Sequence, residues 1–264
     1  DGGAVRGGIG MNMFVSLYLK ELRASRNIFL ICVAVILGCD IFLVTRTASW
    51  GYWNAMAASL IPLVPLIFLG MVQAYLLIND EWKAGTAPFL RSLPISGWGI
   101  VSAKMLAAFT VWVALSLITL AFSGIFYACA PWFSYEWLPL NLLPWSRLIA
   151  FIVIFVLGIS GAVLFGSIIA QMTFLLGRIV NRFNKLISTV ASLVLVYVTT
   201  KGGDWLAGLL SFLPKITFEA PNTGEGGLTL VKQTLPTAAV FVFVLELVLL
   251  FLAAGWIMGK KAES

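Results

Sequence analysis

Six long apolar stretches, separated by more polar segments, dominate the pattern of hydrophobic and polar positions along the chain. They cover approximately residues 28–44, 59–78, 105–127, 148–173, 186–200 and 237–258. A helix needs about 20 predominantly apolar residues to cross the hydrocarbon core of a bilayer. Residues 186–200 form the shortest stretch, which would need flanking residues to complete a span. The pattern therefore predicts an all-α integral membrane protein with six transmembrane helices.

Composition supports the membrane class and excludes several kinds of chemistry. The chain is 61% hydrophobic and only 11% charged, whereas a soluble domain carries about 25% charged residues. The net charge is +6, but the basic residues are spread between the apolar stretches, which argues against a nucleic-acid partner. There is no histidine and no phosphate-binding GxxxxGK[ST] motif. We expect no catalytic residues, bound cofactor or metal in this chain, and hence no enzyme.

The distribution of Lys and Arg predicts the orientation in the membrane. With the N-terminus inside, eleven of these residues fall on the inner side and five on the outer side, Arg6 not counted. Cytoplasmic loops carry the excess of positive charge in membrane proteins. We therefore expect a multi-pass protein of the cell membrane with both termini in the cytoplasm. The absence of paired cysteines and of a cleaved leader favours a bacterial source.

The N-terminal region has two parts. Residues 1–10 are rich in glycine and precede Met11, so we expect a tag remnant or an upstream extension, with residues 11–264 forming one transmembrane domain. Residues 11–27 have an apolar stripe, with basic residues on the other faces. This pattern predicts an amphipathic helix that lies on the membrane surface. The stripe consists of Phe14, Leu17, Tyr18 and Leu22.

Two features lie inside the predicted spans. Small residues recur every four positions in 148–173, namely Gly158, Ala162, Gly166 and Ala170. Such spacing lets a second helix approach closely, either within one subunit or between two. Glu246 lies near the middle of the last span, where a charge costs at least ~2.5–3.5 kcal/mol. It is a candidate for the translocation path, and the alternative is a neutral or hydrogen-bonded contact between helices.

The long segment between the last two spans, residues 201–236, contains DWLAGLLSFLP and PNTGEGG. The first string is apolar enough to enter the membrane as a short helix. The second has the residues of a turn.

The polar segment between the second and third spans, NDEWKAGTAPFLRSLPIS at 79–96, is longer than a simple turn requires. It contains an acidic residue, Gly85-Thr86, Leu93-Pro94-Ile95-Ser96, and then Lys104 at the start of the next span. This arrangement resembles the ABC-2 type transporter permeases. The resemblance extends over the chain, with an amphipathic N-terminal helix, six spans and a long outer segment before the last span. One departure is Ala87-Pro88, where that family more often continues as a helix.

The resemblance implies a cytoplasmic coupling helix between spans two and three that docks on a separate ATPase chain, which would hold ATP and Mg²⁺. It implies a second permease subunit, in a homodimer or a heterodimer, and transport out of the cell. Charged side chains at the docking surface would contact the soluble partner, and apolar ones would anchor it. The residues expected to carry this coupling are Glu81, Trp82, Lys83, Phe89 and Arg91.

Two alternatives stay open at this stage. A secondary transporter or channel that works without ATP would predict inverted repeats and interrupted helices. A substrate-binding component of a vitamin-type uptake system also uses about six spans, but would not be expected to carry the 79–96 segment. The sequence does not indicate the substrate.

Overall fold

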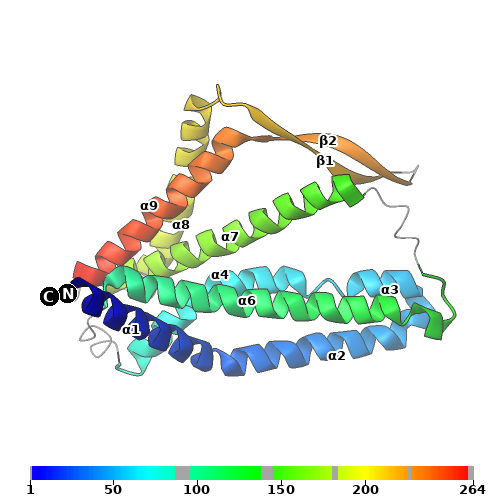
Figure 1. Cartoon of the computed structure of the whole chain (residues 1–264), viewed down its shortest axis with the longest axis horizontal. Coiled ribbons are helices and arrows are strands. Elements are labelled where there is room, and N and C mark those ends of the chain that lie inside the picture. Colours follow the sequence, from blue (N-terminus) through cyan, green and yellow to red (C-terminus); the bar gives the residue numbers. More distant parts are fainter. Residues whose placement is uncertain (1, 87–94, 138–144, 180–183, 225–226, 261–264) are drawn as a thin grey trace.

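The computed structural model describes residues 2–86, 95–137, 145–179, 184–224 and 227–260. Most of them belong to long helices that extend from the end of the molecule holding both termini (Figure 1). The helices are α1 Gly2–Ala24, α2 Arg26–Trp50, α3 Tyr52–Ala58, α4 Leu63–Lys83, α6 Gly97–Ala128, η1 Ala130–Phe133, α7 Trp145–Ile179, α8 Asn184–Leu209 and α9 Thr237–Lys260. We call the end that holds the termini the terminal end, and the other the far end.

Five segments of the described chain are long and apolar enough to cross a membrane. They are Arg26–Trp50, Tyr52–Lys83, Gly97–Ala128, Leu148–Gly177 and Thr237–Gly259. Each contains one of the predicted apolar stretches, so the membrane class follows directly from the sequence. The predicted span 186–200 lies in α8, which is not among the five, and the count of six remains a prediction.

Several helices extend beyond the apolar stretches that predicted them. Backbone hydrogen bonds continue the helix past the last apolar residue wherever no proline or glycine stops them. Thus α4 runs to Lys83, so the first residues of the 79–96 segment are helical. At the other end of that segment, the Ser96 hydroxyl accepts a hydrogen bond from the Gly99 amide at 3.2 Å and caps α6. Helix α1 begins at Gly2, so residues 2–10 continue the helix instead of lying apart from it.

The structure is mostly helical, as predicted, and the segment before the last helix adds two strands to it. Strands β1 Lys215–Gly224 and β2 Gly227–Pro236 form an antiparallel hairpin. Gly224 pairs with Gly227, so the chain reverses inside the stretch predicted as a turn. The short helix predicted for DWLAGLLSFLP does not form as a separate element. Its first part, Asp204–Leu209, is the last part of α8. Alternating side chains such as Ile216 and Phe218 suit a strand, and the Phe218 ring stacks on Phe151 of α7 at 6.4 Å.

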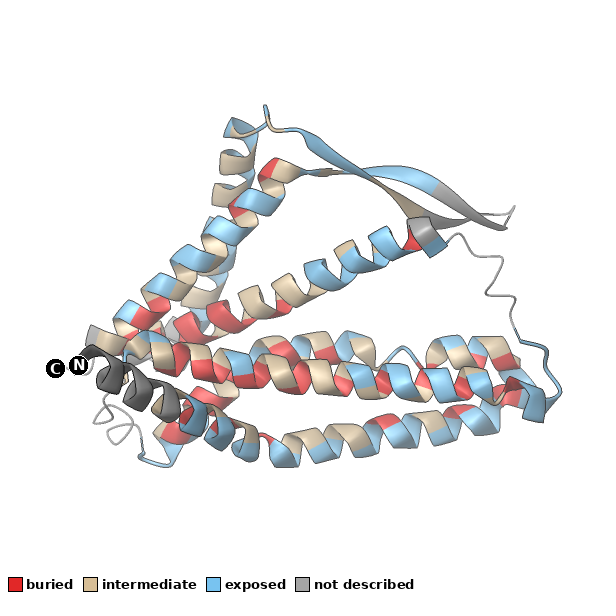
Figure 2. Ribbon diagram, viewed as in Figure 1, coloured by how far each residue is buried: buried red, intermediate tan, exposed pale blue. Residues whose placement is uncertain are grey.

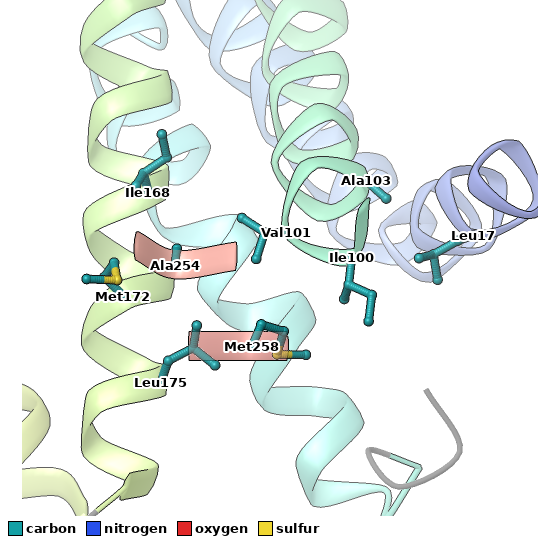
Figure 3. Packing of buried hydrophobic residues seen from close by; sticks show 9 residues of the cluster. All are labelled: Leu17, Ile100, Val101, Ala103, Ile168, Met172, Leu175, Ala254 and Met258. Atoms are coloured by element: carbon teal, nitrogen blue, oxygen red, sulfur yellow. The ribbon is translucent and has the colours of Figure 1, made fainter. Parts of the chain in front are cut away.

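Buried residues concentrate where α4, α6 and α7 meet near the terminal end (Figure 2). One cluster there brings together four helices, and Figure 3 shows its side chains. It consists of Leu17 of α1, Ile100, Val101 and Ala103 of α6, Ile168, Met172 and Leu175 of α7, and Ala254 and Met258 of α9. The surface helix α1 is therefore part of the folded core through Leu17.

Helices α6 and α9 come closest near this cluster. A methyl group on Gly97 would lie 2.6 Å from the amide nitrogen of Gly259, and closer still to the carbonyl oxygen of Gly255. The neighbouring Trp98 indole donates a hydrogen bond to the Leu252 carbonyl at 3.1 Å. The first turn of α6 thus touches the last turns of α9 through backbone atoms, which only glycine permits.

Candidate functional site

Gly85 and Thr86 determine where α4 ends. Gly85 has a φ of 69°, in the left-handed region that glycine adopts without strain. The Thr86 amide donates to the Glu81 carbonyl at 3.0 Å, and the Gly85 amide donates to the Trp82 carbonyl at 3.3 Å. This pair of bonds is a Schellman motif. It fixes the last turn of α4 and places the Glu81 side chain toward α6 and α1.

Four charged side chains meet at this point, and we call them the charge cluster: Lys20 and Glu21 of α1, Glu81 of α4 and Lys104 of α6. The Lys104 ammonium lies 2.6 Å from Glu81 Oε2 and 2.8 Å from Glu21 Oε1. A third oxygen, the Leu77 carbonyl, lies 3.4 Å away. Lys20 Nζ completes the cluster at 2.6 Å from Glu81 Oε1. Three helices from distant parts of the sequence are thereby joined.

Three of the four residues in the charge cluster are buried. Exposed fractions are 0% for Lys104, 1% for Glu21 and 7% for Glu81, whereas the Lys20 side chain is 53% exposed. Burial raises the pKa of the Glu21 carboxyl above its ordinary value of 4.5, and the Lys104 ammonium opposes that shift. Two lysines and two glutamates make the cluster neutral overall. Paired in this way, buried charges can be retained, although any one alone would cost several kcal/mol.

The predicted coupling residues divide into three groups. Glu81 is engaged by two lysines, and the Trp82 ring packs edge-on against Phe174 of α7 at 5.4 Å. Lys83 is exposed at the end of α4. Phe89 and Arg91 lie outside the described residues, as does most of the expected coupling helix. Of these five residues, Lys83 is the one that the structure places at the surface.

Lys20 and Glu21 were not expected in the site, and Lys104 was expected only as part of the motif. Two signals in the sequence point to them. Glu21 is the single acid in the otherwise basic 11–27 segment, and Lys104 opens a long apolar stretch. An acid on a basic surface helix and a lysine at the edge of a span both need an oppositely charged partner, but the sequence does not indicate which residue it is.

Glu246 lies on α9, and its carboxylate faces α8. A methyl group on Gly203 of α8 would lie 3.0 Å from Glu246 Oε1. The contact is close because Gly203 has no side chain. This position fits the alternative of a helix–helix contact, and the part in translocation stays a prediction.

The stripe of small residues on α7 has two different halves. A methyl group on Gly166 would lie 2.5 Å from Met71 Cγ, whereas one on Gly158 would meet no atom within 4 Å. Beside Gly166, the Ser167 hydroxyl donates to the Gly70 carbonyl of α4 at 2.9 Å. Ala162 and Ala170 are half-buried. The Gly166 half therefore packs within this chain, against α4.

We expect Gly166→Ala to lower stability and Gly158→Ala to leave it unchanged or raise it slightly. The first change forces Met71 to move, and overpacking of this kind costs about 1–3 kcal/mol. The second adds helix propensity of about 0.5–1 kcal/mol where space is open. Thermal unfolding of both variants in one detergent measures the difference. A drop for Gly158→Ala as large as for Gly166→Ala would contradict this division and point to a second subunit on the Gly158 half.

The fold is that of a polytopic helical membrane protein whose surface helix and two spans are joined by a buried charge cluster at one end. A family model of the ABC-2 family transporter proteins matches residues 21–183, more than half of the chain. The chain belongs to this family, whose domain is the transmembrane permease of ABC transporters. Neither the comparison with curated proteins nor that with solved structures gave a match.

Proposed function

We propose that the chain is the membrane-spanning permease subunit of an ATP-driven exporter, and that a separate ATPase chain binds it at the terminal end. The observation that carries the proposal is the charge cluster. It joins the end of α4, which leads into residues 87–94, to the surface helix α1 and to the start of α6. A force applied to residues 87–94 would therefore be transmitted to α1, α4 and α6 together.

The charge cluster also refines the part of each coupling residue. Glu81 acts inside the chain and holds the ends of the helices together, since its carboxylate already has two cationic partners. Trp82 anchors the same turn on α7. Direct contact with the ATPase falls to the exposed Lys83 and to Phe89 and Arg91 beyond it. ATP and Mg²⁺ would bind on the partner chain.

The rest of the proposal follows the family. Two permease subunits, identical or different, would enclose the path, and ATP-driven movement of the ATPase would open it alternately to the two sides. Glu246 is the candidate residue for that path. The excess of Lys and Arg supports a cytoplasmic position for the terminal end.

Co-purification tests the proposal. We expect the tagged full-length chain, extracted gently from its native membrane, to bring with it a stoichiometric chain that mass spectrometry identifies as an ATPase with a phosphate-binding loop. Charge reversal at two coupling residues, Lys83→Glu with Arg91→Glu, should reduce its recovery at least about tenfold, because rim charges guide such contacts. Lys83→Glu alone should leave the thermal midpoint unchanged, since Lys83 is exposed.

The matched control is Lys201→Glu with Lys215→Glu, two exposed lysines outside the terminal end that change the net charge equally. This variant should retain the ATPase. A monodisperse chain without an ATPase at any ionic strength would rule the proposal out, and Glu246 would then be examined for ion-coupled transport.

A further inference from the structure

A cavity lies at the elbow between α1 and α2. The helix turns at Ser25, whose hydroxyl donates to the Glu21 carbonyl at 3.0 Å, and α2 continues beside α6 (Figure 1). This cavity, of about 330 Å³, opens between the elbow and α6. Its size suits part of a small amphiphile.

The floor of the cavity is apolar and its rim is cationic. Leu22, Phe29, Val111 and Ala114 contribute hydrocarbon surface from three helices. Arg23 and Arg26 line the same cavity, and both are exposed. Among the described residues neither arginine forms an ion pair. Two unneutralised cations therefore adjoin an open apolar groove.

The wall on the α6 side is held in place. The Thr110 hydroxyl, which also lines the cavity, donates to the Leu106 carbonyl at 2.8 Å. It therefore accepts its 2.9 Å bond from the Tyr18 hydroxyl of α1. This link fixes α1 against α6, so the groove is a formed site and does not depend on closure around a ligand.

We propose that this groove binds an anionic phospholipid of the surrounding membrane, with the phosphate between Arg23 and Arg26 and an acyl chain over Phe29, Val111 and Ala114. The arginines stand at the start of a spanning helix, Arg26–Trp50, where a lipid headgroup meets its acyl chains. Basic pockets between transmembrane helices bind anionic headgroups, and each basic residue near the surface contributes about 1 kcal/mol. A bidentate guanidinium also matches the geometry of a phosphate.

The test is native mass spectrometry of the delipidated full-length chain titrated with phosphatidylglycerol, phosphatidylcholine of the same acyl chains, or inorganic phosphate. We expect one phosphatidylglycerol to bind in preference to phosphatidylcholine. Arg23→Gln with Arg26→Gln should weaken that binding about 30-fold, from two contributions of about 1 kcal/mol. Ala114→Phe, which fills the groove and leaves both arginines, should weaken it as well.

The matched control is Arg46→Gln with Lys201→Gln, which removes two exposed positive charges elsewhere and should bind like the unchanged chain. Equal affinity for the two lipids would overturn the proposal. So would a loss in the control as large as in the arginine variant, or competition by inorganic phosphate at the concentrations of the lipid, which would indicate a small-anion site. Because the readout is lipid binding, its failure is distinct from failure to recover an ATPase.

Discussion

Lys104→Met should leave little folded protein. The substitution keeps most of the side-chain volume but removes the cation that lies between Glu21 and Glu81. Two buried carboxylates would then be left with only the half-exposed Lys20. Breaking a buried ion pair by removing one partner costs about 3–5 kcal/mol, a large share of the ~5–15 kcal/mol that stabilises a folded protein. The thermal midpoint and the recovery of monodisperse protein in detergent measure the effect.

Two further variants make this result specific. Lys83→Met removes an exposed lysine two residues after Glu81 and should leave the midpoint unchanged. Lys104→Met combined with Glu21→Gln and Glu81→Gln removes every charge buried in the cluster and should recover much of the loss, because replacing a whole buried ion pair can be nearly neutral. A midpoint for Lys104→Met equal to that of the unchanged chain would show that the cluster does not hold the helices together.

Gly97→Ala should lower the stability of the protein strongly. The added methyl group would meet backbone atoms of Gly255 and Gly259 on α9, which cannot rotate away as a side chain can. Either α6 or α9 must shift, and overpacking that moves backbone costs up to about 3 kcal/mol. The same shift would strain the hydrogen bond from Trp98 to Leu252. Thermal unfolding measures the loss, and tryptophan fluorescence reports the displaced indole.

Gly124→Ala on the same helix is the control. A methyl group there meets no atom within 4 Å, so the helix should gain slightly in stability. If both alanine variants unfold at the same temperature, the close approach of α6 and α9 is not present in the native protein.

The spans could be predicted because one physical requirement, the length of an apolar stretch, determines them locally. Gly85-Thr86 carries a similar local signal for helix termination, although the apolar stretch alone placed the end of this helix at residue 78 instead of Lys83. The apolar stripe of α1, too, needed only its helical period. In each case a few neighbouring residues contain the information, and no distant contact is required.

The charge cluster could not be predicted in this way. Glu21 and Lys104 are 83 residues apart in sequence, and the packing of α1 against α6, through Leu17 and the Tyr18–Thr110 hydrogen bond, brings them together. Glu81 was predicted to contact the ATPase because residues 79–96 were interpreted as one polar loop. In the structure α4 continues to Lys83, so Glu81 lies in its last turn and is buried. The hairpin was missed because only its turn was interpreted, whereas the alternating residues of Lys215–Gly224 and Gly227–Pro236 on either side were not recognised as strands.

The cluster also determines what a small movement at the terminal end can achieve. Helix α6 has 32 residues and is therefore about 48 Å long. Lys104 joins α6, near its first turns, to both α1 and α4. The rest of the helix would therefore pivot about this point. About 36 Å of α6 lies beyond Lys104, so a rotation of about 5° around that residue would move the far end of the helix by about 3 Å. Movement too slight to break the ion pairs would thus be amplified on the opposite side of the membrane.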